Sequence, residues 1–246
     1  MKVLGIIPSR YESSRFPGKP LIDIKGKSMI QRVYEQAKQS TLINDLIVAT
    51  DDQRIFEQVK TFRGKVIMTS NKHTSGTERC GEVIETYKGY DIIINIQGDE
   101  PLVKPEQLDN LLNTFKNSDV EIATLIKKIT NIDDVVNPNR IKVVLDHKQN
   151  GIYFSRSPIP FVAKHPQNNW LNQTIFWKHI GIYAWRTDVL AQLLKLPKTN
   201  LEITESLEQL RWLFYGYNIK TVETKFETPN IDTPEDLKKV LSLLNK

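Results

Sequence analysis

The sequence contains little that could form disulfides or a zinc site. Its 246 residues include one cysteine, Cys80, and four histidines: His73, His147, His165 and His179. A single cysteine excludes an internal disulfide and fits a reducing compartment, so we expect a cytoplasmic protein. The histidines and the cysteine do not have zinc-site spacing. No stretch is apolar over the length that spans a membrane, and residues 1–8 lead into a strand without signal-peptide features, so we expect no membrane insertion.

The sequence also lacks a dominant charge. Lysines and arginines number 34 and acidic residues 29, for a formal net charge of +5, and the cations are not gathered into one arm. This balance suits a small anionic substrate at least as well as nucleic acid. Basic and aromatic residues do not interleave on a strand face, so we expect no nucleic-acid binding. Hydrophobic residues make up 39%, enough for the core of one α/β domain or of a domain with a sizeable insertion.

The N-terminal segment combines an apolar run with a basic loop. Residues 3–7 predict a buried parallel strand, and residues 8–19 form a loop that ends near a Pro-Gly-Lys turn. Three cations lie in this loop: Arg10, Arg15 and Lys19. A strand, a long loop and a following helix direct backbone N–H groups at an anion, and the cations could bind a polyphosphate. The spacing is not a Walker A motif, and a solvated basic loop closed by a turn is an equally open interpretation.

Strands and helices alternate over residues 1–127. After the first strand, apolar runs predict strands at 46–50, 65–68 and 92–96. Helical spacing predicts helices at 28–39, directly after 51–52, at 76–87 and around 108–115. This alternation predicts an α/β fold with a doubly wound, mostly parallel sheet.

The pattern changes near residues 137–139. Strands at 141–145 and 152–155, joined through an Asn-Gly pair, predict a hairpin, followed by a polar loop at 161–177 and a strand at 178–185. We interpret 131–196 as an inserted antiparallel β subdomain, laid beside the main sheet of a single domain, 1–246. The chain should then form a helix at 202–215, a strand at 218–224 and a final helix from Thr233, with Pro234 in its first turn.

One edge of the predicted sheet should gather the functional side chains. Ligands of doubly wound sheets bind beyond the carboxyl ends of the strands. That edge would receive the loop 8–19 and the segments 50–52, 75–79 and 97–99. Asp99 follows the most hydrophobic strand, and a carboxylate beside phosphates is a usual Mg²⁺ ligand. The alternative for Asp99 is an ordinary turn aspartate.

Several other candidates have structural alternatives that the residues alone leave open. Ser75 and Glu78 fit a capping box, so the segment could cap a helix, contact an anion, or do both. Arg156 follows an apolar strand and could clamp a carboxylate or be a surface cation.

For three further candidates, the spacing alone favours a structural interpretation. His179 and Tyr183 share a strand face, where a core histidine is the more common outcome. Glu208 follows Glu202 and Glu205 at intervals of three residues, which places all three on one helix face. Such a face is usually a solvated acidic surface. From residues alone, the chain is an α/β enzyme that acts on a nucleotide polyphosphate with a metal, and its acceptor is unspecified.

Separated blocks of the sequence, in order, resemble the 3-deoxy-manno-octulosonate (Kdo) cytidylyltransferases, or CMP-Kdo synthetases, nearly end to end. The loop block Arg15-Phe16-Pro17-Gly18-Lys19 is similar to the wider sugar nucleotidyltransferase family. The other blocks are 7–11, 73–79, 95–101, 142–146, 153–156, 179–183, 205–211 and 232–237. The sequence departs from the family at Ser9, where alanine is common, and at Asn230, where glycine is frequent.

The resemblance implies an activity, a cofactor and an assembly. CTP and Kdo would give CMP-Kdo and pyrophosphate with Mg²⁺, for lipopolysaccharide biosynthesis in a Gram-negative cytoplasm. The enzyme would be a homodimer through residues 131–196. An alternative is a cytidylyltransferase for 8-amino-Kdo or another sugar acid. A glycosyltransferase would usually carry Asp-x-Asp where this chain has Gln97-Gly98-Asp99.

The resemblance also implies roles for individual residues. The catalytic residues would be Arg10, Lys19, Asp99 and Asp232, and Asp99 and Asp232 would hold the metal. Further contacts on the nucleotide side would come from Ser13, Ser75, Gly76, Arg79 and Gln97. The sugar acid would be faced by Arg156, His179, Tyr183 and Glu208. Because Thr233 fixes a helix start, and the strand at 218–224 returns the chain to the sheet, we expect Asp232 to lie beside Asp99.

Overall fold

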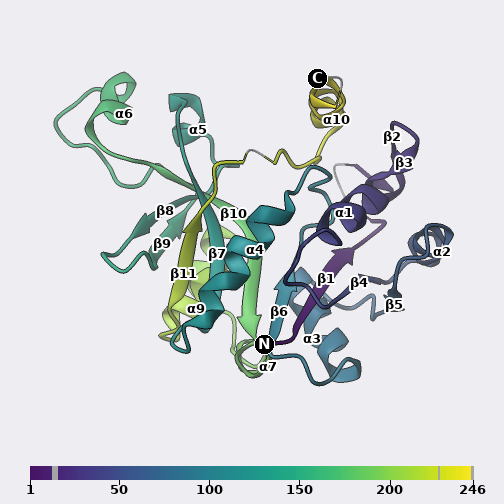
Figure 1. Ribbon diagram of the computed structural model, residues 1–246. Coiled ribbons are helices and arrows are strands. Elements are labelled where there is room, and N and C mark those ends of the chain that lie inside the picture. Colours follow the sequence, from purple (N-terminus) through teal and green to yellow (C-terminus); the bar gives the residue numbers. More distant parts are fainter. Residues whose placement is uncertain (13–15, 227, 245–246) are drawn as a thin grey trace.

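The computed structural model describes residues 1–12, 16–226 and 228–244 (Figure 1). Within these residues, the centre is a nine-stranded sheet whose main row has the order β11-β7-β10-β6-β1-β4-β5. In chain order these strands are β1 (Val3–Ser9), β4 (Asp45–Thr50), β5 (Val66–Met68), β6 (Ile92–Asn95), β7 (Ile122–Lys128), β10 (Trp177–Arg186) and β11 (Ile219–Glu223). Neighbours pair in parallel except at β10, which is antiparallel to β6 and β7. The predicted α/β fold with a mostly parallel sheet is confirmed.

Helices cover both faces of the sheet, as a doubly wound fold requires. One face packs against α1 (Met29–Ala37), α2 (Gln53–Thr61) and α4 (Pro105–Asn113). The other packs against α3 (Gly76–Thr86), α7 (Thr187–Leu193) and α9 (Gln209–Phe214). Shorter elements are η1 (Lys19–Leu21), β2 (Asp23–Ile24), β3 (Lys27–Ser28) and η2 (Thr114–Lys116).

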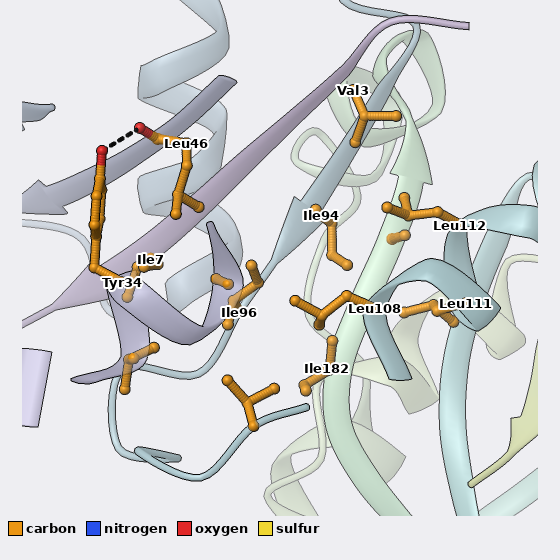
Figure 2. Close-up of a cluster of buried hydrophobic side chains, with 14 of the residues drawn as sticks. Val3, Ile7, Tyr34, Leu46, Ile94, Ile96, Leu108, Leu111, Leu112 and Ile182 are labelled. Carbon is orange, nitrogen blue, oxygen red and sulfur yellow. Dashed lines mark hydrogen bonds between the residues drawn. The ribbon is translucent and has the colours of Figure 1, made fainter. Parts of the chain in front are cut away.

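The buried faces explain why the first strand and the fourth helix form where the sequence predicts them. In β1, Val3 and Ile7 enter one apolar cluster, whereas Leu4 and Ile6 enter the cluster on the opposite face. A strand buried on both faces reads as a continuous apolar run. In Figure 2, leucines of α4 at helical spacing point toward the sheet, where they meet Ile94, Ile96 and Ile182. This packing fixes the carboxyl ends of β1 and β6 side by side.

The chain between β7 and β10 contains the antiparallel hairpin that the sequence predicts, but one strand of the predicted subdomain lies elsewhere. The hairpin of β8 (Lys142–Leu145) and β9 (Gly151–Ser155) is present. Helical turns α5 (Ile132–Val136), η3 (Gln167–Asn169) and α6 (Trp170–Gln173) accompany it, the last two inside the predicted polar loop. The strand at 178–185 is predicted in the inserted subdomain, beside the main sheet, and this placement is wrong. It forms β10, which lies in the middle of the sheet, because Ile182 is buried on one face and Trp185 on the other.

The predicted helix at 202–215 is also wrong, because the chain breaks it into α8 (Asn200–Glu205) and α9. Ser206 adopts the left-handed conformation, with φ 52° and ψ 47°. Leu207 and Leu210 are thereby buried in the core cluster. Glu202 is buried, and Arg211 binds both Glu202 Oε2, at 3.2 Å, and Glu208 Oε1, at 2.8 Å, so these carboxylates are not part of a solvated acidic stripe.

The C-terminal part returns to the sheet as predicted. Strand β11 pairs in parallel with β7, and α10 (Pro234–Leu243) begins after Thr233, whose side chain forms a capping box with Asp236. Between them the chain crosses to α10, which lies beside β2 and β3 in Figure 1, and Ile231 packs with Ile24 there. Among the described residues, no helix combines the length and apolar character needed to cross a membrane.

Candidate active site

Two adjoining cavities lie at the sheet edge where β1, β4 and β6 end and the antiparallel β10 begins. The larger, of about 600 Å³, is lined by Pro8, Ser9, Arg10, Glu12, Lys19, Pro20, Thr74, Gln97, Gly98, Asp99 and Asp232. We call it the basic-loop cavity. The second, of about 300 Å³, shares Gln97 and Asp99 with it and is bounded by the start of β10, including His179. We call it the β10 cavity. Gln97 and Asp99 therefore lie at the border between the two cavities.

Lys19 joins the two carboxylates that the sequence predicts to converge. Its Nζ donates to Asp99 Oδ2 at 2.6 Å, to Asp232 Oδ1 at 3.0 Å and to the Ile231 carbonyl at 3.2 Å. The backbone is joined as well, since Ile231 N donates to Asp99 O at 2.9 Å. Burial alone would lower the pKa of Lys19, but the two carboxylates outweigh it and raise the pKa. Lys19 is therefore a charged ammonium, and the convergence of Asp99 and Asp232 is confirmed.

Arg10 brings a second cation to the basic-loop cavity. Its guanidinium donates to the carbonyl oxygen of His73, in the loop that precedes α3. Burial, together with the charge of Arg79, lowers the pKa of Arg10. A guanidinium stays protonated in proteins, so Arg10 presents a positive charge to the cavity.

The first turn of α3 meets Glu208. The Ser75 side chain accepts from Glu78 N at 3.1 Å in a capping box, as predicted, and its hydroxyl donates to Glu208 Oε1 at 3.2 Å. Arg211 donates to the same oxygen at 2.8 Å. Burial raises the pKa of Glu208. A third cavity, of about 420 Å³, is lined by Ser75, Glu208 and Arg211 among others.

Gly76 begins α3 against the ends of two strands. A Cβ at this position would lie 3.4 Å from Asn95 Nδ2 and 3.5 Å from Pro8 Cγ, which are ordinary contact distances. The structure therefore places Gly76 where it packs the helix start against β1 and β6. Ser13, the remaining predicted contact in the basic loop, lies outside the described residues.

His179 lines the β10 cavity, whereas Tyr183 lies deeper. His179 Nε2 is 3.0 Å from Thr124 Oγ1, and its ring packs edge-on against Phe154. Burial lowers the pKa of His179 to about 3, so the ring is neutral at neutral pH. Tyr183 is 7% exposed and stacks on Trp185 in the core. The structural interpretation thus holds for Tyr183, whereas His179 is both packed and accessible from the cavity.

The neutral state of His179 gives a pH-dependent stability. The unfolded chain protonates this histidine near pH 6.5, and the folded chain does so only near pH 3. Since the unfolded state binds more protons between these values, the contribution to stability is complete above about pH 6.5 and is lost progressively as the pH falls toward 3. We expect His179→Gln to remove this component, which is at most about 1.4 kcal/mol per pH unit.

Urea unfolding of the wild type and the variant between neutral pH and mildly acidic pH measures the difference in slope. His147→Gln is the matched control, because His147 is exposed. Equal pH slopes for the wild type and His179→Gln would contradict the burial of a neutral ring.

Two predicted substrate contacts are turned into the protein. Arg79 is 0% exposed, and its guanidinium binds Asp51 Oδ2 at 2.7 Å and the Thr69 hydroxyl. Its predicted place on the wall of the cytidine site is wrong, because it instead ties together the ends of β4 and β5. Arg156 donates to the carbonyls of Glu205, at 2.7 Å, and Pro138, at 3.1 Å. These bonds occupy the guanidinium that was predicted to clamp a carboxylate, so a clamp would need Arg156 to rearrange.

The β10 cavity is built mainly from residues that the sequence did not single out. Two cations, Arg140 and Lys178, and the amides of Asn139, Gln209 and Asn230 line it. They come from the chain before β8, the start of β10, the start of α9 and the chain before α10. No local motif joins these positions, and only the departure at Asn230 drew attention to one of them. The basic-loop cavity is charged, and the β10 cavity offers amides, cations and a neutral imidazole.

Known proteins match the chain over nearly all of its length. The family model described as cytidylyltransferase matches residues 4–222. The 3-deoxy-manno-octulosonate cytidylyltransferase of Parabacteroides distasonis is 51% identical over 249 residues, covering 99% of this chain and 98% of that protein. The enzyme of the same name from Cytophaga hutchinsonii is 50% identical, covering 98% of this chain and 96% of that protein.

Solved structures agree with these relatives. A CMP:2-keto-3-deoxy-manno-octonic acid synthetase complexed with CTP superposes with a TM-score of 0.93 at 44% identity, over 100% of this chain and 99% of that one. A putative glucose-1-phosphate thymidylyltransferase from Bacillus anthracis has a TM-score of 0.68 at 17% identity, over 98% of this chain and 94% of that one. At 17% identity, this second match shows a similar fold and nothing more.

Proposed function

Since the chain belongs to the cytidylyltransferase family, we propose that it transfers the cytidylyl group of CTP to Kdo, forming CMP-Kdo and pyrophosphate. The geometry that carries this proposal is the pair of adjoining cavities. One contains the cations Arg10 and Lys19 beside two carboxylates, and the other contains amides, cations and a neutral histidine. A triphosphate suits the first and a polyhydroxy acid suits the second, so the two substrates would meet at Gln97 and Asp99.

In the proposed reaction, the anomeric hydroxyl of Kdo attacks the α-phosphorus of CTP. A new P–O bond forms as the bond to the β-phosphate breaks, the hydroxyl proton is released, and pyrophosphate leaves. A protein accelerates such transfers mainly by positioning the reactants in line and by stabilising charge. Arg10 and Lys19 would bind the triphosphate, and Gln97, held by its hydrogen bond to the Gly181 carbonyl, would lie where the two substrates meet.

The two carboxylates also fit a divalent cation. Asp99 and Asp232 direct oxygens at one ammonium, 2.6 and 3.0 Å away, so their oxygens already converge around a positive charge. Two carboxylates, completed by phosphate oxygens and water, are a donor set that suits Mg²⁺. We propose that Asp99 and Asp232 hold Mg²⁺ when CTP is bound. The metal would supply charge neutralisation on the phosphate oxygens.

Release of pyrophosphate from CTP tests the proposed function. We expect release when Kdo is added with Mg²⁺, and little without a sugar acid. A panel of Kdo, 8-amino-Kdo and sialic acid distinguishes the alternative acceptors, since the preferred one gives the highest kcat/KM. A glycosyltransferase would consume CMP-Kdo instead of producing it. An absence of pyrophosphate with every acid in the panel would refute the proposal.

We also propose a homodimer formed through residues 131–196. Two aromatic side chains of this region, Phe154 and Phe176, are buried within the protomer. Exposed apolar side chains remain, notably Ile152 at 57% and Phe161 at 72%. Both residues lie in the region through which the resemblance implies the dimer contact, and an interface would remove these apolar side chains from water.

The dimer is tested by sedimentation at micromolar concentration, where we expect a dimer for the wild type. The double variant Ile152→Glu/Phe161→Glu should sediment as a monomer, because burying two carboxylates at an apolar interface is strongly unfavourable. Phe214→Glu is the matched control, since Phe214 is equally exposed, at 63%, but lies in α9. A monomeric wild type, or a double variant that stays dimeric, would refute the proposed interface.

The proposal includes a role in lipopolysaccharide biosynthesis and a cytoplasmic location. Kdo is activated as its CMP derivative before it is transferred, so the product would feed a glycosyl transfer. Cys80 is buried and unpaired, which fits a reducing compartment.

A further inference from the structure

We propose that Glu82 is a positioning residue for the nucleotide site, acting on Arg10 through the loop 70–75. This inference rests on the proposed function only in taking CTP as the ligand. Glu82 lies on α3 and is not among the residues that line the basic-loop cavity. Its effect on that cavity must therefore pass through the loop that joins β5 to α3.

The first step is the attachment of the loop to α3. Glu82 Oε2 accepts from Ser70 N at 2.8 Å and contacts His73 Nε2. A carboxylate can only accept, so the imidazole is the donor in this bond. Burial alone would raise the pKa of Glu82, but the hydrogen bonds from Ser70 and His73 outweigh it and lower the pKa. Glu82 is thus a carboxylate that holds two points of the loop.

The second step leads from the loop to the cavity. The carbonyl oxygen of His73 accepts from the Arg10 guanidinium. Arg10 lines the basic-loop cavity, and Thr74, the residue after His73, lines the same cavity. Glu82 and Arg10 are therefore joined through one residue, whose side chain binds the carboxylate and whose backbone binds the guanidinium.

The base of this arrangement is rigid. Helix α3 is anchored in the core by Cys80 and Val83, both 0% exposed. One turn before Glu82, Glu78 accepts from Ser75 N at 3.3 Å and from the Thr74 backbone. Two glutamates on consecutive turns of one helix thus hold the loop at both its start and its end. A loop fixed this way gives the His73 carbonyl one position, and Arg10 with it.

Glu82→Gln keeps the shape of the side chain and removes its charge. Both donors reach the same oxygen, Glu82 Oε2, so an amide oxygen there keeps the geometry but not the charge, and the hydrogen bonds from Ser70 and His73 both weaken. We expect CTP to bind about tenfold more weakly, since misplacing a charged hydrogen-bond donor costs a large part of its contribution. The KM for Kdo should stay unchanged, because Arg10 does not line the β10 cavity.

Equilibrium titration with CTP and Mg²⁺ in the absence of a sugar acid measures the effect. Glu85→Gln is the matched control, because Glu85 lies on the same helix and is exposed. The same titration in an Arg10→Ala background separates positioning from general damage. If Glu82 acts through Arg10, Glu82→Gln should cause no further loss of CTP affinity in that background.

The outcomes distinguish this inference from the proposed function. If the wild type does not bind CTP, the proposed function itself fails. If the wild type binds CTP and Glu82→Gln binds it equally well, only the role of Glu82 is refuted. A tenfold loss that persists in the Arg10→Ala background would also refute it, because Glu82 would then act on CTP by another route.

Discussion

Lys19→Ala is expected to lower kcat/KM for CTP by about 100- to 1,000-fold, the effect of removing a donor from a preorganised charged site. The Lys19 ammonium lies on the wall of the basic-loop cavity and contacts Asp99 and Asp232, so it would lie beside both the phosphates and the proposed metal. Removing it would delete a charge-assisted contact with the phosphates and leave Mg²⁺ to neutralise the two carboxylates.

The matched control is Lys27→Ala. Lys27 is also paired with a carboxylate, Glu35, at 2.6 Å, but the pair is exposed. Exposed pairs contribute little, so we expect near wild-type kinetics and stability. Single-turnover rates and circular dichroism of both variants check the expectation. Near wild-type activity of a folded Lys19→Ala protein would mean that Lys19 serves only the structure, through its ion pairs with Asp99 and Asp232, and does not act on the phosphates.

The position of Lys19 shows which part of the site the sequence could predict. The buried strand before the loop, and the strand before Asp99, are apolar on both faces, so their direction and their common edge follow from burial. Asp232 precedes a helix start with Thr233 as its N-cap, which restricts where the side chain can lie. Because these elements have strong local signals, the sequence predicts correctly that Lys19, Asp99 and Asp232 meet in the basic-loop cavity.

Arg79 shows where sequence reasoning failed. In the sequence, nothing distinguishes Arg79 from Arg10 as a possible ligand of the nucleotide. The difference arises only in three dimensions, because Asp51 and Thr69 from two other strand ends reach the Arg79 guanidinium and bury it. Partners that are distant in the chain leave no local signal.

The break at Ser206 and the position of β10 could not be predicted for a related reason. Apolar spacing over 202–215 is helical on both sides of the break, and a single serine in a left-handed conformation does not change that periodicity. Strand β10 has the apolar pattern of any buried strand, and its pairing partners, β6 and β7, are set by the tertiary fold. The β10 cavity depends on both features, which is why its lining residues were missed.

Asp232→Asn is expected to reduce activity nearly to background and to raise the Mg²⁺ concentration needed for half-maximal activity, with little change in Tm. The side chain of Asp232 is directed at Lys19 and accepts from Asn230 Nδ2 at 2.7 Å. The bonds that cap α10 belong to its neighbours, since Thr233 accepts from Asp236 N and Asp236 accepts from the Thr233 backbone. An amide at position 232 keeps the size of the side chain but loses the negative charge that a divalent cation prefers.

Asp236→Asn separates this role from helix capping, because it weakens the same helix start and leaves both converging carboxylates in place. Asp236 contacts Asp232 only through the backbone, since its Oδ2 accepts from Asp232 N at 3.2 Å. Asp236 is the N3 residue of the capping box, and a carboxylate in the first turn contributes about 0.3–1 kcal/mol, so the Tm of the variant should fall by up to about 4 °C while its Mg²⁺ requirement stays unchanged. Binding of Mg²⁺ with CTP, followed by calorimetry, gives a readout independent of turnover. If Asp232→Asn instead loses stability and keeps both its activity and its Mg²⁺ affinity, Asp232 serves only the positive end of the helix dipole, worth about 0.3–1 kcal/mol. Asp99 would then have to hold the metal without it.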